Sequence, residues 1–200
     1  SSNRRQRQMC IRDRDYCINC AAYTEVDKAE EEAEKVYSIN ATAVKNLAEA
    51  CQKTGAVLIH ISTDFVFDGT KRTPYTEEDT PNPLSVYGKS KLKGEEHVQE
   101  SCDRHFIVRT SWLYSEYGNN FVKTMLRLAE TRKQISVVND QIGSPTYAGD
   151  LAEFSLKVIS SGSTAYGLYH YSNLGAISWY DFAVEIFKQH KKEVRVVPIP

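Results

Sequence analysis

The segment SVYGKSKLKGEEH, residues 85–97, carries a tyrosine and a lysine four positions apart, Tyr87 and Lys91. If the segment is helical, residues i and i+4 lie one turn apart on one face, so the phenol and the ammonium can serve one site. Such pairs are also common on solvated helix surfaces, where both side chains extend into water. The pair alone leaves both readings open, and the surrounding sequence decides between them.

Apolar strands alternate with amphipathic helices through the first half of the chain. Continuous apolar runs predict buried strands at residues 15–22, 56–62 and 105–110. We expect helices between them at residues 27–55 and 86–101, the first broken near residues 38–40 and stopped by Gly55. This alternation predicts βαβ units and an α/β fold with a doubly wound parallel sheet, covered on both faces.

The pattern changes after Ser111, where the segments become shorter. We expect a helix at 119–133, a strand at 135–138, a loop at 139–149, a helix at 150–160, a strand at 167–172, a helix at 178–190 and a strand at 194–198. These elements predict a second, smaller α/β lobe.

Composition and charge exclude several classes of protein. A formal net charge of −1 gives no general attraction to nucleic acid or to an anionic membrane. The longest apolar run, residues 56–61, is too short to span a bilayer, and no signal peptide is visible. The first 14 residues hold five arginines against one aspartate, and we expect this basic segment to be non-native.

The five cysteines indicate a reduced, cytoplasmic compartment, because their number is odd and they are scattered. Cys17 and Cys20 have the spacing of a redox or metal motif, but they lie in an apolar strand and no second ligand pair follows. We therefore expect no metal site. His60 lies within a strand, where we expect a hydrogen-bonded core histidine.

In open parallel sheets, ligands bind beyond the carboxyl ends of the strands. That rule places three loops on one rim, at residues 21–24, 62–68 and 110–112. The helix that carries Tyr87 and Lys91 begins close behind the second of these loops. Several polar groups therefore converge on one predicted crevice.

Tyr87 can act as a general acid for a carbonyl that is being reduced. A free phenol has a pKa near 10, and we expect Lys91 to lower it, because a unit charge at about 4 Å is worth up to about 4 kcal/mol. Thr63 can hydrogen-bond the substrate oxygen and orient it. Together, Thr63, Tyr87 and Lys91 predict a hydride-transfer site.

A series of motifs then extends the pattern over residues 15–200. INCAAYTEVDKAE, ISTDFVFDGT, VYGKSKLKGE, RTSWLY, GNNFVKTML and DQIGSPTYAGDLA follow one another along the chain. Their order resembles that of the extended short-chain dehydrogenase/reductase superfamily, and within it the dTDP-4-dehydrorhamnose reductase family. In this context the functional reading of Tyr87 and Lys91 is favoured over the surface reading.

The resemblance implies roles for single residues. Thr63, Tyr87 and Lys91 resemble the catalytic set, and the resemblance implies that Tyr87 and Lys91 also contact the cofactor. The other implied cofactor-binding positions are Ala21, Ala22, Thr24 and Ser62. The implied substrate-binding positions are Thr63, Phe65, Val26, Trp112 and Asn120. Trp112 can also be plain core, and Asn120 can also be a helix cap.

The resemblance also implies a fold and a reaction. It implies a Rossmann domain, partial in this chain and spanning residues 15–110, followed by a substrate-binding lobe at residues 111–200 with segments that return to the sheet. The implied reaction is the NADPH- or NADH-dependent reduction of the 4-keto group of dTDP-4-dehydro-L-rhamnose in the cytoplasm. It implies a dTDP-sugar as substrate and allows a homodimer.

The sequence departs from the family pattern in two ways. Position 65 is Phe where the family usually has Tyr, so one substrate contact is in question. None of the ten glycines forms the Gly-rich turn that binds a pyrophosphate at a helix N-terminus. We therefore expect this chain to be a fragment that neither binds NADPH tightly nor catalyses the reduction.

Two other functions remain open from the sequence. One is an epimerase or dehydratase of the same superfamily, although residues 63–65 lack the Asp-Glu pair typical of dehydratases. The other is a non-catalytic binding module like the regulatory β subunit of methionine adenosyltransferase. Turnover of dTDP-4-dehydrorhamnose distinguishes the three.

Overall fold

The structure is a computed structural model, and it describes residues 14–200. The arginine-rich residues 1–13, part of the segment expected to be non-native, lie outside the described residues. The described chain divides into two units. The first contains the residues up to Arg109 and Val158–His170, and the second contains Thr110–Lys157 and Tyr171–Pro200.

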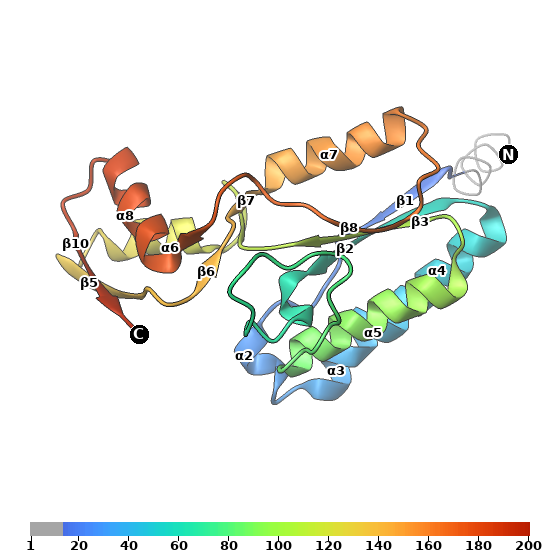
Figure 1. Ribbon diagram of the computed structural model, residues 1–200, viewed down its shortest axis with the longest axis horizontal. Helices are drawn as coiled ribbons and strands as arrows, with labels where there is room; N and C mark the ends of the chain where they lie inside the picture. The colour runs from blue at the N-terminus through green and yellow to red at the C-terminus, as the bar shows by residue number, and fades with distance from the viewer. Residues whose placement is uncertain (1–13) are drawn as a thin grey trace, which may run out of the picture. The chain divides into compact units, whose positions relative to one another are not determined.

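The first unit is built on a four-stranded sheet in the order β1-β2-β3-β8 (Figure 1). Its strands are β1 (Tyr16–Asn19), β2 (Val57–Thr63), β3 (His105–Thr110) and β8 (Gly167–His170). β1 pairs with β2 in parallel, and β3 pairs with β8 in parallel. The predicted α/β class is confirmed, because apolar strands do alternate with helices along this part of the chain.

The prediction that residues 15–22 form a buried strand is wrong. β1 lies at the edge of the described sheet, and Ile18 is 41% exposed. Cys20 is exposed, whereas Cys17 packs beside the buried core. The apolar composition of residues 15–22 predicted that a strand forms here. Whether that strand is buried depends on neighbouring elements, which the local sequence does not specify.

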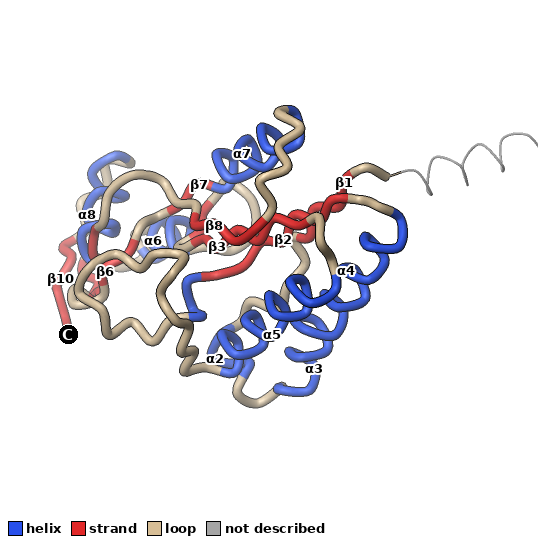
Figure 2. The backbone as a smooth tube through the Cα atoms, turned by 45° about the vertical axis from the view of Figure 1, so that its right-hand side comes forward, coloured by secondary structure: helices blue, strands red, loops and turns tan. Residues whose placement is uncertain are grey.

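Helices α4 (Ala43–Thr54) and α5 (Val86–Ser101) lie on the same face of this sheet (Figure 2). Their apolar side chains meet those of β2 and β3 in one core. The buried members of this core are Val44, Ala48, Cys51, Ala56, Leu58, Val98, Cys102 and Ile107. This packing fixes α5, the helix of Tyr87 and Lys91, against the sheet.

The predicted helix at residues 27–55 breaks at a different place from the one expected. The structure has α2 (Val26–Ala29), α3 (Ala33–Tyr37), a π-helical turn (Ser38–Thr42) and then α4. The break therefore falls at residues 30–32, and the helix continues through residues 38–40 with a wider turn. The helix ends at Gly55, whose φ of 73° lies in the left-handed region, as predicted.

The π-helical turn is held by Asn40, which is completely buried. Its side chain accepts a hydrogen bond from the Tyr23 N–H at 2.8 Å and donates to the Tyr23 carbonyl at 3.1 Å. It also donates to the Ser90 hydroxyl on α5 at 3.0 Å. These tertiary contacts of Asn40 explain the wider turn, because they connect the loop after β1 to α5.

We expect Gly94→Ala to destabilise the chain by about 1–3 kcal/mol, because a Cβ at Gly94 would lie 2.3 Å from the Asn40 carbonyl oxygen. This cost should exceed the roughly 1 kcal/mol that alanine gains over glycine inside a helix. Urea unfolding measures the difference. Lys89→Ala, at an exposed position of the same helix, is the matched control and should change stability by less than about 0.5 kcal/mol. A Gly94→Ala chain as stable as the unchanged one would contradict the close helix approach.

The second unit has three short two-stranded sheets and two packed helices. Its elements are β4 (Leu113–Tyr114), α6 (Phe121–Leu128), β5 (Gln134–Val138), β6 (Ile142–Gly143), β7 (Thr146–Tyr147), β9 (Ile177–Ser178), α8 (Trp179–Gln189) and β10 (Arg195–Ile199). α7 (Ala148–Ser160) begins in this unit and ends in the first. β5 pairs with β10, β4 with β7, and β6 with β9.

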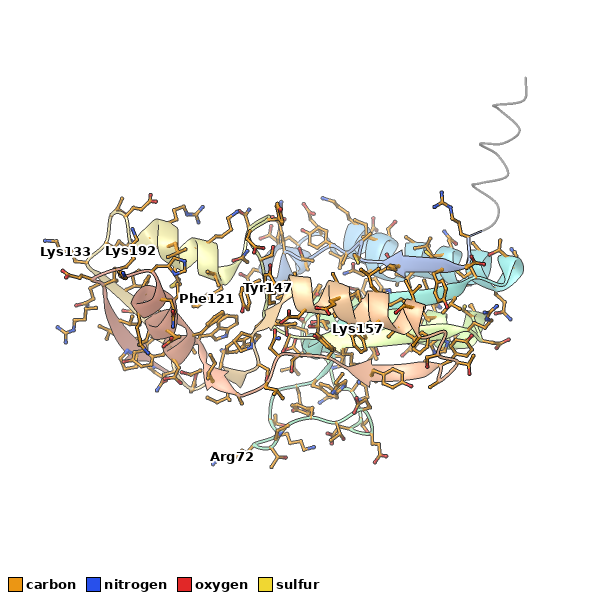
Figure 3. The ribbon with its side chains drawn as sticks, turned by 90° about the horizontal axis from the view of Figure 1, so that it is seen from above. Arg72, Phe121, Lys133, Tyr147, Lys157 and Lys192 are labelled. Atoms are coloured by element: carbon orange, nitrogen blue, oxygen red, sulfur yellow. The ribbon has the colours of Figure 1, made fainter. Side chains whose placement is uncertain are left out.

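Two expectations for this unit were wrong. The helix expected at 119–133 already ends at Leu128, and the loop expected at 139–149 contains β6 and β7. Strands of two residues carry no periodicity, so no sequence pattern marks them. The core of this unit contains Met125, Ile135, Val137, Ala183, Ile186 and Phe187. Phe121 packs beside it (Figure 3).

Within residues 14–200, none of the helices is long and apolar enough to cross a membrane.

Candidate active site

The N-terminus of α5 is fixed by two hydrogen bonds to its free backbone N–H groups. The Ser85 hydroxyl accepts from the Gly88 N–H at 3.0 Å, and the Glu30 carboxylate accepts from the Val86 N–H at 2.8 Å. Ser85 is therefore a helix N-cap. Gly88 also allows close packing, since a Cβ there would lie 2.2 Å from the Phe65 carbonyl oxygen. These contacts place the first turn of α5 against the turn that follows β2.

Tyr87 and Lys91 both lie on the buried face of α5, as the i,i+4 spacing predicted. Tyr87 is 8% exposed and Lys91 is 2% exposed. Tyr87 packs in a small cluster with Tyr23, Ala29 and Val36. The surface reading of the pair is therefore wrong, and both polar groups point into the first unit.

Thr63 lies at the end of β2 and caps the 3₁₀ turn Asp64–Val66. Its hydroxyl accepts from the Phe65 N–H at 3.2 Å and donates to the Asp64 carboxylate at 3.1 Å. The Thr63 side chain also lies close to the Tyr87 phenol, whose pKa it lowers in part. The structure thus brings Thr63 and Tyr87 together, although 24 positions separate them along the chain.

The expectation that Lys91 lowers the pKa of Tyr87 is wrong. Burial raises the pKa of Tyr87, and the Asp64 charge raises it further, while the Thr63 side chain lowers it only in part. The physical reason is that Lys91 faces elsewhere: its Nζ donates to the Ile61 carbonyl of β2 at 2.8 Å. Tyr87 therefore stays protonated at neutral pH, which is the form that a proton donor requires.

Lys91 is a buried ammonium whose charge is partly compensated. Burial lowers the pKa of Lys91 to about 8, while the neighbouring Glu95 and Cys20 oppose this shift. Burial also disfavours the charged form of Asp64, and it raises the pKa of that carboxyl group to about 6. Both directions follow from the cost of a charge in a medium of low dielectric constant.

Glu95 and Arg109 form a buried ion pair beside Lys91. Arg109 Nη2 lies 2.7 Å from Glu95 Oε2, and Arg109 Nε lies 3.0 Å from Glu95 Oε1. The Ser62 hydroxyl donates to the same carboxylate at 2.5 Å. Ser62 was predicted to contact the cofactor, and the structure points its side chain at Glu95.

The other predicted cofactor positions lie in the loop after β1. Ala21 and Thr24 are exposed, and Ala22 is half-buried. The loop is anchored at Asn19, whose side-chain oxygen accepts from the Ala21 N–H at 3.2 Å. β1 ends opposite His60, the register partner of Asn19, whereas β2 continues to Thr63.

Two of the predicted substrate positions lie next to Tyr87. Val26 packs against the cluster that contains the Tyr87 ring. Phe65 is 42% exposed, and its ring meets that of Tyr87 edge to face, with centroids 5.5 Å apart. The first unit thus gathers Val26, Thr63, Phe65, Tyr87 and Lys91 in one place.

Trp112 and Asn120 belong to the second unit. Trp112 stacks on Trp179 with ring centroids 3.5 Å apart and has an unusual φ of 47°. Asn120 caps α6, because its side chain accepts from the Lys123 N–H at 3.1 Å, and it donates to the Ser115 carbonyl at 2.7 Å. In the described structure, Asn120 acts as the N-cap of α6, and Trp112 forms an aromatic stack with Trp179.

Residues 3–200 match the family model of the RmlD substrate binding domain. The chain belongs to this family. The dTDP-4-dehydrorhamnose reductase of Aggregatibacter actinomycetemcomitans is 49% identical over 176 residues, which cover 86% of this chain and 60% of that protein. The chain therefore spans about 60% of the length of this curated relative.

Solved structures agree with the assignment to the RmlD family. The dTDP-4-dehydrorhamnose reductase of Bacillus anthracis, in complex with NADP, is 50% identical and has a TM-score of 0.91 over 97% of this chain and 69% of that one. The UDP-Glc/GlcNAc 4-epimerase of Campylobacter jejuni has a TM-score of 0.77 at 20% identity, with 93% of this chain covered and 65% of that one. This second likeness shows the fold alone. The predicted Rossmann-like fold is confirmed.

Sequence reasoning missed three side chains that this RmlD-family chain places around the site. Asn40, Glu95 and Arg109 were not singled out, although each is buried and hydrogen-bonded. Only Glu95 had a usable signal: it follows Lys91 by four positions, so the two lie on one face of a helix. The partners of Asn40 and Arg109 lie on other elements.

His60 is a core histidine, as predicted, and its Nδ1 lies 3.0 Å from Asn19 Nδ2. The prediction that it is fully hydrogen-bonded is wrong, because its buried Nε2 has no partner among the described residues. Burial and the charge of Lys91 lower the pKa of His60 to about 3. In the unfolded chain the His60 imidazole takes up a proton near pH 6.5, whereas in the folded chain it does so only near pH 3. We therefore expect the contribution of His60 to stability to decrease as pH falls from about 6.5 toward 3.

A comparison with His60→Gln isolates this effect, because Asp64, with its raised pKa, has the opposite pH dependence. Urea unfolding is measured near neutral pH and at about pH 4.5 for both chains. We expect the unchanged chain to lose about 2–3 kcal/mol more than the variant, because pH 4.5 lies two units below the unfolded pKa of His60. Equal losses would assign the acid sensitivity to other groups.

Proposed function

We propose that the protein reduces the 4-keto group of dTDP-4-dehydro-L-rhamnose to give dTDP-L-rhamnose, with NADPH or NADH as the reductant. One observation carries the proposal. Thr63 lies beside Tyr87 in the first unit, and Lys91, on the same face of α5 as Tyr87, donates to Ile61 two residues before Thr63. The chain that holds them is 49% identical to a protein named dTDP-4-dehydrorhamnose reductase. The Bacillus anthracis structure, solved with NADP, supports the coenzyme class.

The residues around Lys91 fit the nicotinamide side of such a coenzyme. Lys91 has three N–H donors, one of which goes to the Ile61 carbonyl, and the others suit ribose hydroxyl groups. Ala21 and Ala22, in the adjacent loop, have small side chains that let a ligand approach the backbone. We also propose Thr24 and Ser62 as cofactor-binding positions, Ser62 through its backbone, because its hydroxyl donates to Glu95.

When bound, the reduced nicotinamide supplies a hydride to C4 of the sugar. Tyr87 donates its phenolic proton to the carbonyl oxygen as negative charge develops there. Thr63 hydrogen-bonds the same oxygen and orients it toward Tyr87. Lys91 holds the ribose and places its positive charge beneath the site. The raised pKa of Tyr87 agrees with the role of a proton donor.

We propose Val26, Thr63 and Phe65 as the substrate-binding positions of the first unit. Trp112 and Asn120 are proposed as substrate-binding positions of the second unit, each considered within its own unit. We place the reaction in the cytoplasm, because the described cysteines are free and persist best in a reducing compartment. A formal net charge of −1 favours neither a nucleic acid nor an anionic membrane as partner.

The test uses this chain and any longer product of its gene. Each is incubated with dTDP-4-dehydro-L-rhamnose and either NADPH or NADH, and coenzyme oxidation and product mass are followed. From the longer product we expect a compound with two more hydrogens than the substrate and stoichiometric coenzyme oxidation. This chain, which lacks the Gly-rich turn, is expected to show neither. A product of unchanged mass without coenzyme oxidation indicates an epimerase, and binding without turnover indicates a non-catalytic module. Lys89→Ala, an exposed position between Tyr87 and Lys91, is the matched control and should keep full activity.

A further inference from the structure

Two side chains of α5, one turn apart, hold two successive residues at the end of β2. Lys91 donates to the Ile61 carbonyl at 2.8 Å, and Glu95 accepts from the Ser62 hydroxyl at 2.5 Å. The next residue along β2 is Thr63. The helix therefore contacts the strand at the two positions that lead directly into the proposed catalytic residue.

The carboxylate of Glu95 is also held from β3. Arg109 binds it through Nε and Nη2, and the side chains of Arg109 and Glu95 are only 5% and 2% exposed. The Arg109 guanidinium lies over the Phe67 ring, 5.1 Å from its centroid. Three elements of the first unit, α5, β2 and β3, thus meet at one carboxylate.

We propose that Glu95 is a positioning residue of the reductase site, which fixes Ser62 before Thr63 and presents a negative charge to Lys91. This inference rests on the proposed function. A carboxylate in this place does two things that an apolar residue of similar size does not: it orients the end of β2 through Ser62, and it favours the charged form of Lys91.

The charges that act on these groups come from every strand of the unit. Lys91 interacts with Glu95 on its own helix, with Cys20 after β1 and with His60 on β2. Glu95 interacts with Arg109 on β3 and with His170 on β8. Of the groups named here, Glu95 is the one carboxylate next to Lys91. Its replacement should therefore lower the pKa of Lys91 further.

The direct test is an NMR titration of this chain with ¹³C-labelled lysine side chains, in which the Lys91 signal is assigned through Lys91→Arg. We expect Glu95→Gln to move the Lys91 titration midpoint down by about one pH unit, because an opposite charge has been removed from its neighbourhood. Glu96→Gln removes the same charge one residue further along, from an exposed pair with Lys93, and should leave the midpoint unchanged. Equal midpoints in Glu95→Gln and the unchanged chain would overturn the proposal.

A second measurement examines catalysis in whichever gene product turns over the sugar nucleotide. We expect the alkaline limb of the pH–rate profile of Glu95→Gln to move to lower pH by about the same amount, with kcat reduced more than KM is raised. Loss of folding alone would lower the active fraction without moving that limb. An unmoved limb in a folded Glu95→Gln variant would contradict the proposal.

If Glu95→Gln does not fold, Ser62→Ala replaces it, because it removes only the hydroxyl that Glu95 accepts. We then expect kcat to fall by about fivefold or more, the effect of about 1 kcal/mol from one lost hydrogen bond, with KM little changed. An unchanged kcat would overturn the positioning role. The NMR titration needs no turnover, so a failure of the proposed reaction and a failure of this inference are distinguishable.

Discussion

Tyr87→Phe is expected to lower kcat by at least about 10²-fold with little change in KM for the sugar nucleotide, because general acid catalysis contributes about 10²–10⁴-fold. The phenolic proton is needed mainly as the alkoxide forms, so its loss affects the transition state more than the bound substrate. The phenyl ring keeps the edge-to-face contact with Phe65. The measurement is steady-state kinetics in the gene product that shows turnover.

Tyr23→Phe is the control for this experiment, because Tyr23 lies in the same apolar cluster and also loses only a hydroxyl group. That hydroxyl donates to Glu32 at 3.0 Å and has no proposed part in the chemistry. We expect its kcat to stay close to that of the unchanged protein. If Tyr87→Phe behaved like Tyr23→Phe, Tyr87 would not be the proton donor.

Arg109→Met is expected to have the largest effect on stability, a loss of about 3–5 kcal/mol. Arg109 and Glu95 are both buried in the first unit, and removal of the guanidinium leaves the carboxylate there without its counter-ion. Urea unfolding of the chain measures the loss. A pair that contributed only geometry, with little electrostatic energy, would give a much smaller value.

The double variant Arg109→Met with Glu95→Met separates these two causes. Because apolar replacements remove both buried charges, we expect it to recover most of the stability lost by the single variant. Lys93→Met, which breaks the exposed pair with Glu96 on the same helix, should cost less than about 1 kcal/mol. If the double variant were as unstable as the single one, the uncompensated charge would not be the cause.

The order of strands and helices in the first unit could be predicted from local patterns. The helix at residues 86–101 and the strand at residues 105–110 agree with α5 and β3 at both ends. Amphipathic periodicity and apolar runs are local properties, so they are visible without a structure. The shared face of Tyr87 and Lys91 could also be predicted, because residues four positions apart on a helix lie on the same face.

The short strands of the second unit could not be predicted in this way. β6 and β7 have two residues each and form only because β9 and β4 lie beside them. The π-helical turn likewise depends on Asn40 meeting Tyr23 and Ser90, which lie 17 positions before it and 50 positions after it. Such contacts are made across the fold and leave no periodic trace.

The sequence by itself determined the α/β class, the family resemblance and the three residues proposed for catalysis, because these follow from motifs and periodicities. Only the tertiary structure decided that Ile18 is exposed, that Glu95 and Arg109 form a buried pair, and that the pKa of Tyr87 is raised while that of Lys91 is lowered. The physical reason is that burial and electrostatic energy depend on groups brought together from distant parts of the chain.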